Sequence, residues 1–206
     1  MNASRSDSPT RRTGRPIDRS SDALVLSSAL ELLAERDYER FTVDEVAART
    51  GKAKTTLYRR WPTKEDLVLA AISAIGRPPE LDALPETGSL RSDLLAVIDS
   101  PWLGGASRRT SIFASLISAT RNSERIARAV RAEVTEPYVD IYRRILSRAA
   151  NGQDAADRAS RIRVLAEVIP AMSTHRLGSD SESPSRDFFV SVVDEVVLPA
   201  LMSARP

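Results

Sequence analysis

Two short amphipathic segments joined by one glycine, within residues 42–61, constrain the fold of this chain more than any other feature of its sequence. Thr42 and Glu45 have the Thr-x-x-Glu spacing of a capping box, which predicts the start of a helix. Gly51 follows the last residue of that helix, where a left-handed backbone conformation turns the chain at little cost. A second helix is expected from about residue 53 to residue 61. The segment is therefore predicted to form a helix-turn-helix.

Apolar residues define the buried side of this helix pair. Phe41 and Val46 occupy the two positions of a hydrophobic staple. Leu57 and Trp61 lie four residues apart, so they share the buried face of the second helix. Pro62 ends that helix because it cannot donate a backbone hydrogen bond.

The opposite face of the second helix is cationic and rich in hydroxyl groups. Residues 49–60 contain five basic residues and no acidic one. Lys54, Thr55, Tyr58 and Arg59 project from this face, where they suit phosphate oxygens and base edges. DNA binding is the first interpretation. The alternatives are a solvated charged face and a helical interaction module whose basic helix docks an acidic protein, and salt dependence and sequence preference would separate these from DNA binding.

The flanking segments complete a small helical domain over residues 20–75. Residues 20–37 carry apolar side chains at helical spacing, and neither short helix could bury its own apolar face without them. Thr63 and Asp66 form another capping signature, followed by an apolar stripe that ends at Gly76. Residues 1–19 hold too few apolar side chains to fold alone, and are expected to be a flexible basic arm or a solvated tail.

A stretch rich in proline and glycine, from Gly76 to Gly88, marks the expected domain boundary, so residues 76–206 form a second domain. Its apolar residues recur at helical spacing. Pro137 is expected at the first turn of a helix or at a kink, and Pro170 interrupts a long helix. The β-branched segment 188–201 has apolar pairs every four residues, which favours helix over strand. The fold class is all-α.

Composition excludes several kinds of chemistry. The chain has no cysteine and one histidine, His175, so it lacks disulfides, thiolate catalysis and the ligands of a conventional zinc site. It has no phosphate-binding glycine loop and no Glu-x-x-His pair. We therefore expect no enzyme activity, no cofactor and no metal. No apolar run approaches a membrane span and no apolar signal region is seen, so a cytoplasmic location is expected.

Residues 21 to about 75 resemble the N-terminal DNA-binding domain of the TetR family of transcriptional regulators. The resemblance covers about a quarter of the chain. It implies that the second domain is a helical ligand-binding and dimerisation domain, and that the protein is a sequence-specific regulator, commonly a repressor. The matching residues are Val25-Leu26, Ala29-Leu30, Leu33-Ala34, Tyr38, Thr42-Val43, Val46-Ala47, Gly51, Thr56-Leu57-Tyr58, Trp61, Lys64-Glu65 and Leu67.

The resemblance also implies roles for individual residues. Thr42 would cap its helix beside a phosphate, Lys54, Thr55 and Tyr58 would face DNA, and Lys64 would contact the backbone. Three positions depart from the family pattern: Asp37 replaces a usual glycine, Lys52 replaces a small apolar residue, and Ala53 replaces a capping serine. The expected DNA-binding residues are Arg15, Thr42, Lys52, Lys54, Thr55, Thr56, Tyr58, Arg59 and Lys64.

The resemblance further implies three partners: double-stranded DNA with a near-palindromic operator, a second copy of the chain and a small-molecule effector. Two C-terminal helices, about 154–176 and 185–202, would form a four-helix bundle across a two-fold axis. Each effector candidate has plain core packing as its alternative. Candidates for effector binding are Trp102, Phe113, Tyr138, Tyr142 and His175, and those for the dimer interface are Ile162, Leu165, Ile169, Phe188, Val192 and Val196.

Overall fold

The computed structural model describes residues 19–149, 155–179 and 184–203, and every regular element among them is helical. The α-helices are α1 (Arg19–Arg40), α2 (Val43–Thr50), α3 (Lys54–Arg60), α4 (Lys64–Ser73), α5 (Leu90–Ile98), α6 (Ala106–Thr120), α7 (Glu124–Val130), α8 (Glu136–Ala149), α9 (Ala155–Ser179), α10 (Arg186–Val192) and α11 (Leu198–Met202). The 3-10 turns η1 (Pro79–Leu81) and η2 (Trp102–Gly104) and the π-turns η3 (Arg131–Thr135) and η4 (Val193–Val197) connect them. The predicted all-α fold is confirmed.

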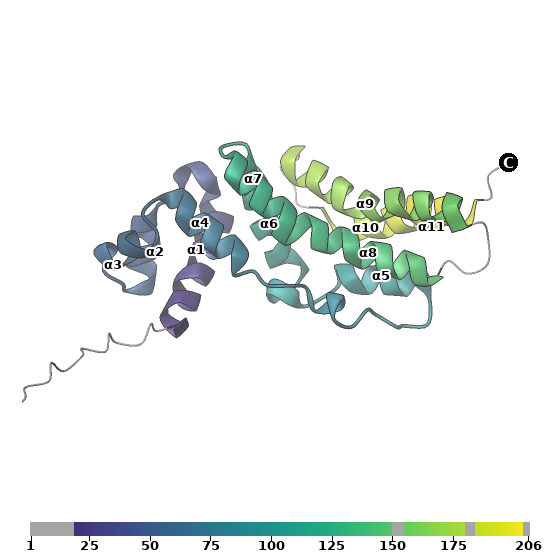
Figure 1. Cartoon of the computed structure of the whole chain (residues 1–206), viewed down its shortest axis with the longest axis horizontal. Helices are drawn as coiled ribbons and strands as arrows, with labels where there is room; N and C mark the ends of the chain where they lie inside the picture. The colour runs from purple at the N-terminus through teal and green to yellow at the C-terminus, as the bar shows by residue number, and fades with distance from the viewer. Residues whose placement is uncertain (1–18, 150–154, 180–183, 204–206) are drawn as a thin grey trace, which may run out of the picture.

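The molecule is elongated, with α2 and α3 at one end and α9, α10 and α11 at the other (Figure 1). The helices α6 and α7 lie between these ends. Residues 1–18 of the predicted basic arm, including Arg15, lie outside the described residues, and Arg19 is the first residue of α1. No helix of the described part is long and apolar enough to cross a membrane.

The local sequence signals of the helix-turn-helix are found in the structure. The hydroxyl of Thr42 accepts a hydrogen bond from the Glu45 amide at 3.2 Å, and Gly51 ends α2 with φ 64° and ψ 18°. The capping-box spacing also predicts that the Glu45 carboxylate accepts a hydrogen bond from the Thr42 backbone amide, and this detail was wrong. The Glu45 carboxylate accepts its hydrogen bond from the Thr42 hydroxyl at 3.0 Å, not from the Thr42 backbone amide. Thr63 and Asp66 form a complete capping box at the start of α4.

Asp37 has a positive φ, as expected for a residue that replaces glycine, but its backbone lies outside the left-handed helical region. Its φ is 64° and its ψ is 167°, a combination that side chains with a Cβ seldom adopt. The Asp37 carboxylate accepts a hydrogen bond from the Arg40 amide at 3.1 Å. The backbone of α1 is therefore interrupted near its end, and the chain turns toward α2.

Two apolar cores hold the molecule together. The first joins α1–α4 to α6 and α7, and the second joins α5, α8, α9, α10 and η4. Phe41 and Val46, the predicted staple, are both fully buried in the first core. Because α6 and α7 share that core, residues on both sides of position 75 pack together. The boundary between residues 75 and 76 stays a prediction.

Two prolines sit at the second residue of a helix that follows a π-turn. Pro137 follows η3 and Pro199 follows η4. Proline has no N–H to donate within a helix and crowds the preceding turn, and a wider π-turn accommodates both effects. The helix that begins with α7 therefore continues into α8, so Pro137 lies at a first turn without ending the helical path.

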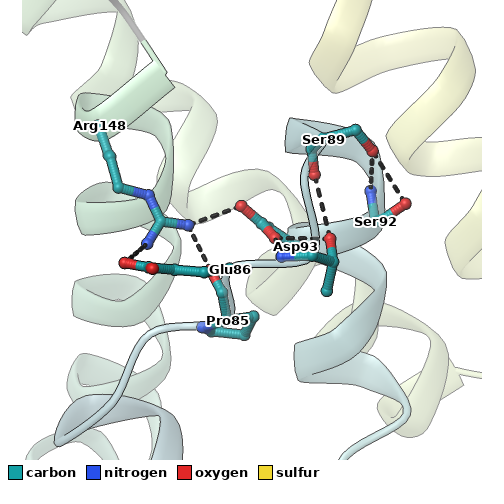
Figure 2. Close-up of polar contacts among 7 residues, drawn as sticks. Pro85, Glu86, Ser89, Ser92, Asp93 and Arg148 are labelled. Atoms are coloured by element: carbon teal, nitrogen blue, oxygen red, sulfur yellow. Dashed lines mark hydrogen bonds and ion pairs between the residues drawn. The ribbon is translucent and has the colours of Figure 1, made fainter.

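A buried carboxylate ties the segment between η1 and α5 to α8 (Figure 2). Asp93 accepts hydrogen bonds from the Thr87 amide at 2.7 Å and from the Arg148 guanidinium at 2.6 Å. Arg148 also donates to the carbonyl of Pro85 and pairs with Glu86. Burial opposes ionisation of Asp93, but the hydrogen bonds from Thr87 and Arg148 outweigh it, so its pKa lies below the ordinary value.

Candidate nucleic-acid interface

The outer face of α3 is exposed, and its inner face is anchored in the first core. Leu57 is buried, Trp61 is partly buried against the same core, and Tyr58 is 44% exposed. Lys54, Thr55, Thr56 and Arg59 are also exposed. The Gly51 turn and the Leu57 anchor together hold this face away from the body of the protein. The geometry fits a helix that enters a DNA groove.

An acidic residue of α2 contacts two side chains of this face. The Asp44 carboxylate lies 2.6 Å from the Lys54 Nζ and accepts a hydrogen bond from the Tyr58 hydroxyl at 3.3 Å. The hydrogen bond to Lys54 is the main reason that the pKa of Asp44 lies below its ordinary value. The same hydrogen bond raises the pKa of Lys54. Asp44 was not among the residues expected at this site, although its position at the start of α2 could have indicated it.

Other carboxylates pair with basic side chains around this face. Arg49 makes two hydrogen bonds to Glu35, at 2.8 and 2.7 Å, and Arg60 pairs with Asp22. Within the described part of the chain, neither Lys52 nor Arg59 makes an ion pair with an acidic side chain. These two residues are therefore the cations of 49–60 most available to phosphate.

Lys64 is held by its own domain. Its Nζ donates to the carbonyls of Tyr38 at 2.7 Å and Glu39 at 3.3 Å, and lies 4.5 Å from the centre of the Tyr38 ring. A cation there satisfies carbonyls near the end of α1. The resemblance implied a phosphate contact for Lys64, whereas this geometry gives the side chain a capping role.

Ala53 precedes α3 without a side-chain capping hydrogen bond, as its replacement of serine implied. The α3 helix begins at Lys54. Thr42 is exposed at the start of α2, where its hydroxyl is already paired with Glu45.

Among the described residues no group of three or more histidine, cysteine, aspartate or glutamate side chains could hold a metal ion.

A cavity of about 1300 Å³ lies between α6, α8 and α9, far from α3. Four of the five candidate effector-binding residues line it: Phe113, Tyr138, Tyr142 and His175. Trp102 does not line the cavity directly. Its ring packs against the rings of Phe113 and Tyr138, with centroid distances of 6.3 and 5.8 Å, so it supports the cavity wall.

The predicted dimer residues divide into buried and accessible ones. Ile162, Leu165, Ile169 and Val192 are at most 6% exposed and belong to the second core of their own chain. Their apolar spacing indicated a buried face, and the structure shows that this face is used within the chain. Phe188 is partly buried and Val196 is 43% exposed. The accessible apolar residues of these helices are Val164, Met172, Val196 and Met202.

Sequence comparison identifies two family domains in the chain. Residues 25–71 match the description "Bacterial regulatory proteins, tetR family", and residues 84–196 match "Tetracyclin repressor-like, C-terminal domain". The first match contains α2 and α3 in full, and the second contains α5–α10.

Characterised and uncharacterised regulators are similar to the chain over most of its length. A DNA-binding transcriptional repressor TetR from Mycobacteroides abscessus is 33% identical over 177 residues, which cover 85% of this chain and 91% of the relative. An uncharacterized HTH-type transcriptional regulator of Mycobacterium tuberculosis is 32% identical over 201 residues, covering 93% of this chain and 95% of the relative.

Two solved structures resemble the fold. The TetR family transcription regulator SCO0332 superposes with a TM-score of 0.54 at 26% identity, covering 91% of this chain and all of that chain. A putative TetR-family transcriptional regulator from Mesorhizobium loti has a TM-score of 0.58 at 17% identity, with 88% and 95% covered, which supports the fold alone.

Proposed function

The chain belongs to the TetR family of bacterial regulatory proteins, and we propose that it is a repressor that acts as a homodimer. In this proposal the dimer binds a near-palindromic operator and leaves it when a small molecule fills the cavity. As a member of this family it is a DNA-binding transcriptional regulator. The exposed cationic face of α3 is the observation that supports the proposed DNA contact most strongly. It combines an anchored inner residue, Leu57, with outward hydroxyl and basic groups.

The proposed dimer uses the end of the molecule opposite α3. Val164 in α9 and Val196 in η4 are 62% and 43% exposed, and α9 and η4 pack against one another. Exposed apolar side chains on two elements that pack together support a protein interface at this end of the molecule. A two-fold axis through this layer would present two copies of α3 on one side, about 34 to 36 Å apart for successive major grooves.

The proposed effector response uses contacts that connect the cavity helices to the DNA-binding helices. Arg108 of α6 pairs with Glu31 of α1 at 2.7 Å, and Arg125 of α7 pairs with Glu65 of α4 at 2.8 Å. Ser123 also donates to the Glu65 carboxylate. A ligand that fits only one arrangement of α6 and α7 would shift α1 and α4 with them, and would favour a separation of the two α3 helices that DNA does not accept.

Selection of operator fragments from genomic DNA, followed by in vitro transcription from a selected promoter, tests the proposed function. Added protein should lower transcript yield from that promoter and leave a promoter with a scrambled site unaffected. Arg59→Ala should weaken binding to all DNA and reduce the salt slope by about 0.9, because one phosphate contact is lost. Arg128→Ala, an exposed arginine of α7, is the matched control and should leave both quantities unchanged. Transcript yield that rises or stays constant with added protein would contradict repression.

A further inference from the structure

The geometry of the cavity points to an organic anion with an apolar body as its ligand, with the anionic group bound by Arg109 and by the hydroxyls of Tyr138 and Tyr142. This inference rests on the proposed effector function of the cavity. It adds the chemical class of the ligand and the residue that selects it.

Arg109 is a cavity-lining cation that is only 7% exposed. Its Nη1 donates to the carbonyls of Ser100 at 2.7 Å and Trp102 at 3.3 Å, and its Nη2 donates to the carbonyl of Ile98 at 2.5 Å. A guanidinium has five N–H groups. The Nε and one further N–H of Arg109 have no hydrogen-bond partner among the described residues.

Arg109 makes no direct ion pair among the described residues, although its charge, after that of Arg186, contributes to lowering the pKa of Asp99 at longer range. No aspartate or glutamate of the described residues lies within 4.0 Å of its guanidinium. The carbonyls at the end of α5 offer partial negative charge, but dipoles compensate a buried cation less fully than a carboxylate does. A buried cation of this kind favours an anion that can reach it through the cavity.

Two tyrosine hydroxyls provide further hydrogen-bond donors in the same cavity. Tyr142 is 2% exposed and makes no hydrogen bond among the described residues. Every fully inaccessible side-chain nitrogen or oxygen in the described part has a partner, so the unpaired hydroxyl of Tyr142 must retain contact with open space. Since Tyr142 lines the cavity, that space is the cavity.

Arg109 lies close enough to these hydroxyls to influence them. Burial raises the pKa of Tyr138 and of Tyr142, while the positive charge of Arg109 acts in the opposite direction on both. Both phenols are therefore neutral donors at neutral pH. A carboxylate in this part of the cavity would accept hydrogen bonds from them and from Arg109.

The rest of the wall favours an apolar ligand body. Phe113, Leu116, Val134 and Phe189 contribute apolar surface to the cavity. Two acidic lining residues, Asp99 and Asp140, are already paired with Arg186 and Arg143. Two further acidic residues of the wall, Glu136 and Glu167, make no ion pair among the described residues, but the lining arginines outnumber the four lining carboxylates. These arginines are Arg109, Arg131, Arg143, Arg163 and Arg186.

A matched pair of probes tests the inference: 4-butylbenzoate, an anion at pH 7.5, and 4-butylbenzamide, its neutral counterpart. Calorimetric titration of the full-length protein should show the benzoate binding at least about tenfold more tightly, since a charge-assisted hydrogen bond is worth roughly 1.5 to 3 kcal/mol. Arg109→Gln should reduce that preference to about twofold or less. Tyr142→Phe should weaken benzoate binding several-fold with little effect on the benzamide. Circular dichroism checks that each variant is folded.

Equal or tighter binding of the benzamide by the wild type would overturn the anion assignment, and so would the absence of any benzoate binding. The assignment would also be overturned if the folded Tyr142→Phe and Arg109→Gln variants both kept the wild-type preference for benzoate over benzamide. Operator affinity is measured on the same samples. Specific operator binding without a benzoate preference would reject the ligand class alone, whereas a benzoate preference without specific DNA binding would reject the proposed repressor function alone.

Discussion

The carboxylate of Asp44 lies 2.6 Å from the Nζ of Lys54, so an acidic residue of α2 holds a basic residue of the α3 face that is proposed to contact DNA. The same carboxylate accepts a hydrogen bond from Tyr58. A DNA phosphate must compete with Asp44 for both groups. Such competition weakens binding to every duplex, and a site that offers additional base contacts overcomes it.

Asp44→Asn should therefore increase affinity for unrelated DNA. Freeing Lys54 adds a phosphate contact and removes a repulsive charge, so we expect a gain of about three- to tenfold at 0.15 M salt and a salt slope steeper by about 0.9. Fluorescence anisotropy with a random duplex measures both. Asp194→Asn breaks a comparable aspartate–arginine pair in the other half of the molecule and should change neither. Weaker binding by Asp44→Asn would instead mean that Asp44 positions Lys54 for DNA.

The strained backbone of Asp37 predicts an unusual order of stability between two substitutions. In most helices alanine is more favourable than glycine. At φ 64° and ψ 167° this order should reverse, with Asp37→Gly more stable than Asp37→Ala by about 1 to 2 kcal/mol. Both variants lose the hydrogen bond to the Arg40 amide equally, so their difference isolates the backbone term. Urea denaturation measures it, and a more stable alanine variant would contradict the described conformation.

Asp93 predicts a pH-dependent contribution to stability. Its pKa in the folded protein lies below the ordinary value, so its contribution is complete above the unfolded pKa of about 3.9 and is lost as the pH falls through the folded pKa. Asp93→Asn should lower the free energy of unfolding by about 1 to 3 kcal/mol at pH 7. The difference from wild type should shrink below about pH 4, as urea unfolding at each pH would show.

Glu86 offers the control for Asp93, because both carboxylates pair with Arg148 (Figure 2). The Glu86 side chain is 82% exposed and that of Asp93 is 10% exposed. An exposed pair contributes little in water. Glu86→Gln should therefore leave unfolding nearly unchanged at every pH, and a loss as large as that of Asp93→Asn would show that burial is not the cause.

Val164 tests the proposed dimer surface. The wild type should sediment as a dimer at micromolar concentration, and Val164→Asp should raise the dissociation constant at least about tenfold, since an unpaired charge in an apolar interface costs several kcal/mol. Leu24→Asp places the same charge on another exposed apolar position, in α1, and should remain dimeric. A dimeric Val164→Asp variant would place the interface elsewhere.

Local signals in the sequence predicted the helix-turn-helix well because they act between neighbours. Caps, the Gly51 turn and the spacing of Leu57 and Trp61 depend on residues within one or two helical turns. The outward face of α3 followed directly from that periodicity. The hydroxyl-to-carboxylate form of the Thr42 cap was missed because either pairing satisfies the same spacing.

Contacts between distant segments were not predictable in this way. An apolar stripe shows that a face is buried but not what buries it, so Ile162 and Leu165 were assigned to a dimer interface although they pack within their own chain. The pairing of Lys64 with carbonyls of α1 and the burial of Arg109 likewise depend on tertiary packing. Neither has a signature in the surrounding sequence.

The central claim is that the exposed face of α3 reads a DNA sequence, and competition binding tests it most directly. Labelled duplex containing a site selected from genomic fragments is bound to the protein at 0.15 M salt and challenged with unlabelled selected or scrambled duplex. The claim predicts that the selected duplex competes at least about 10³-fold better, and that Thr55→Ala changes the order of preference among single-base variants of the site. Equal competition by the scrambled duplex would contradict it.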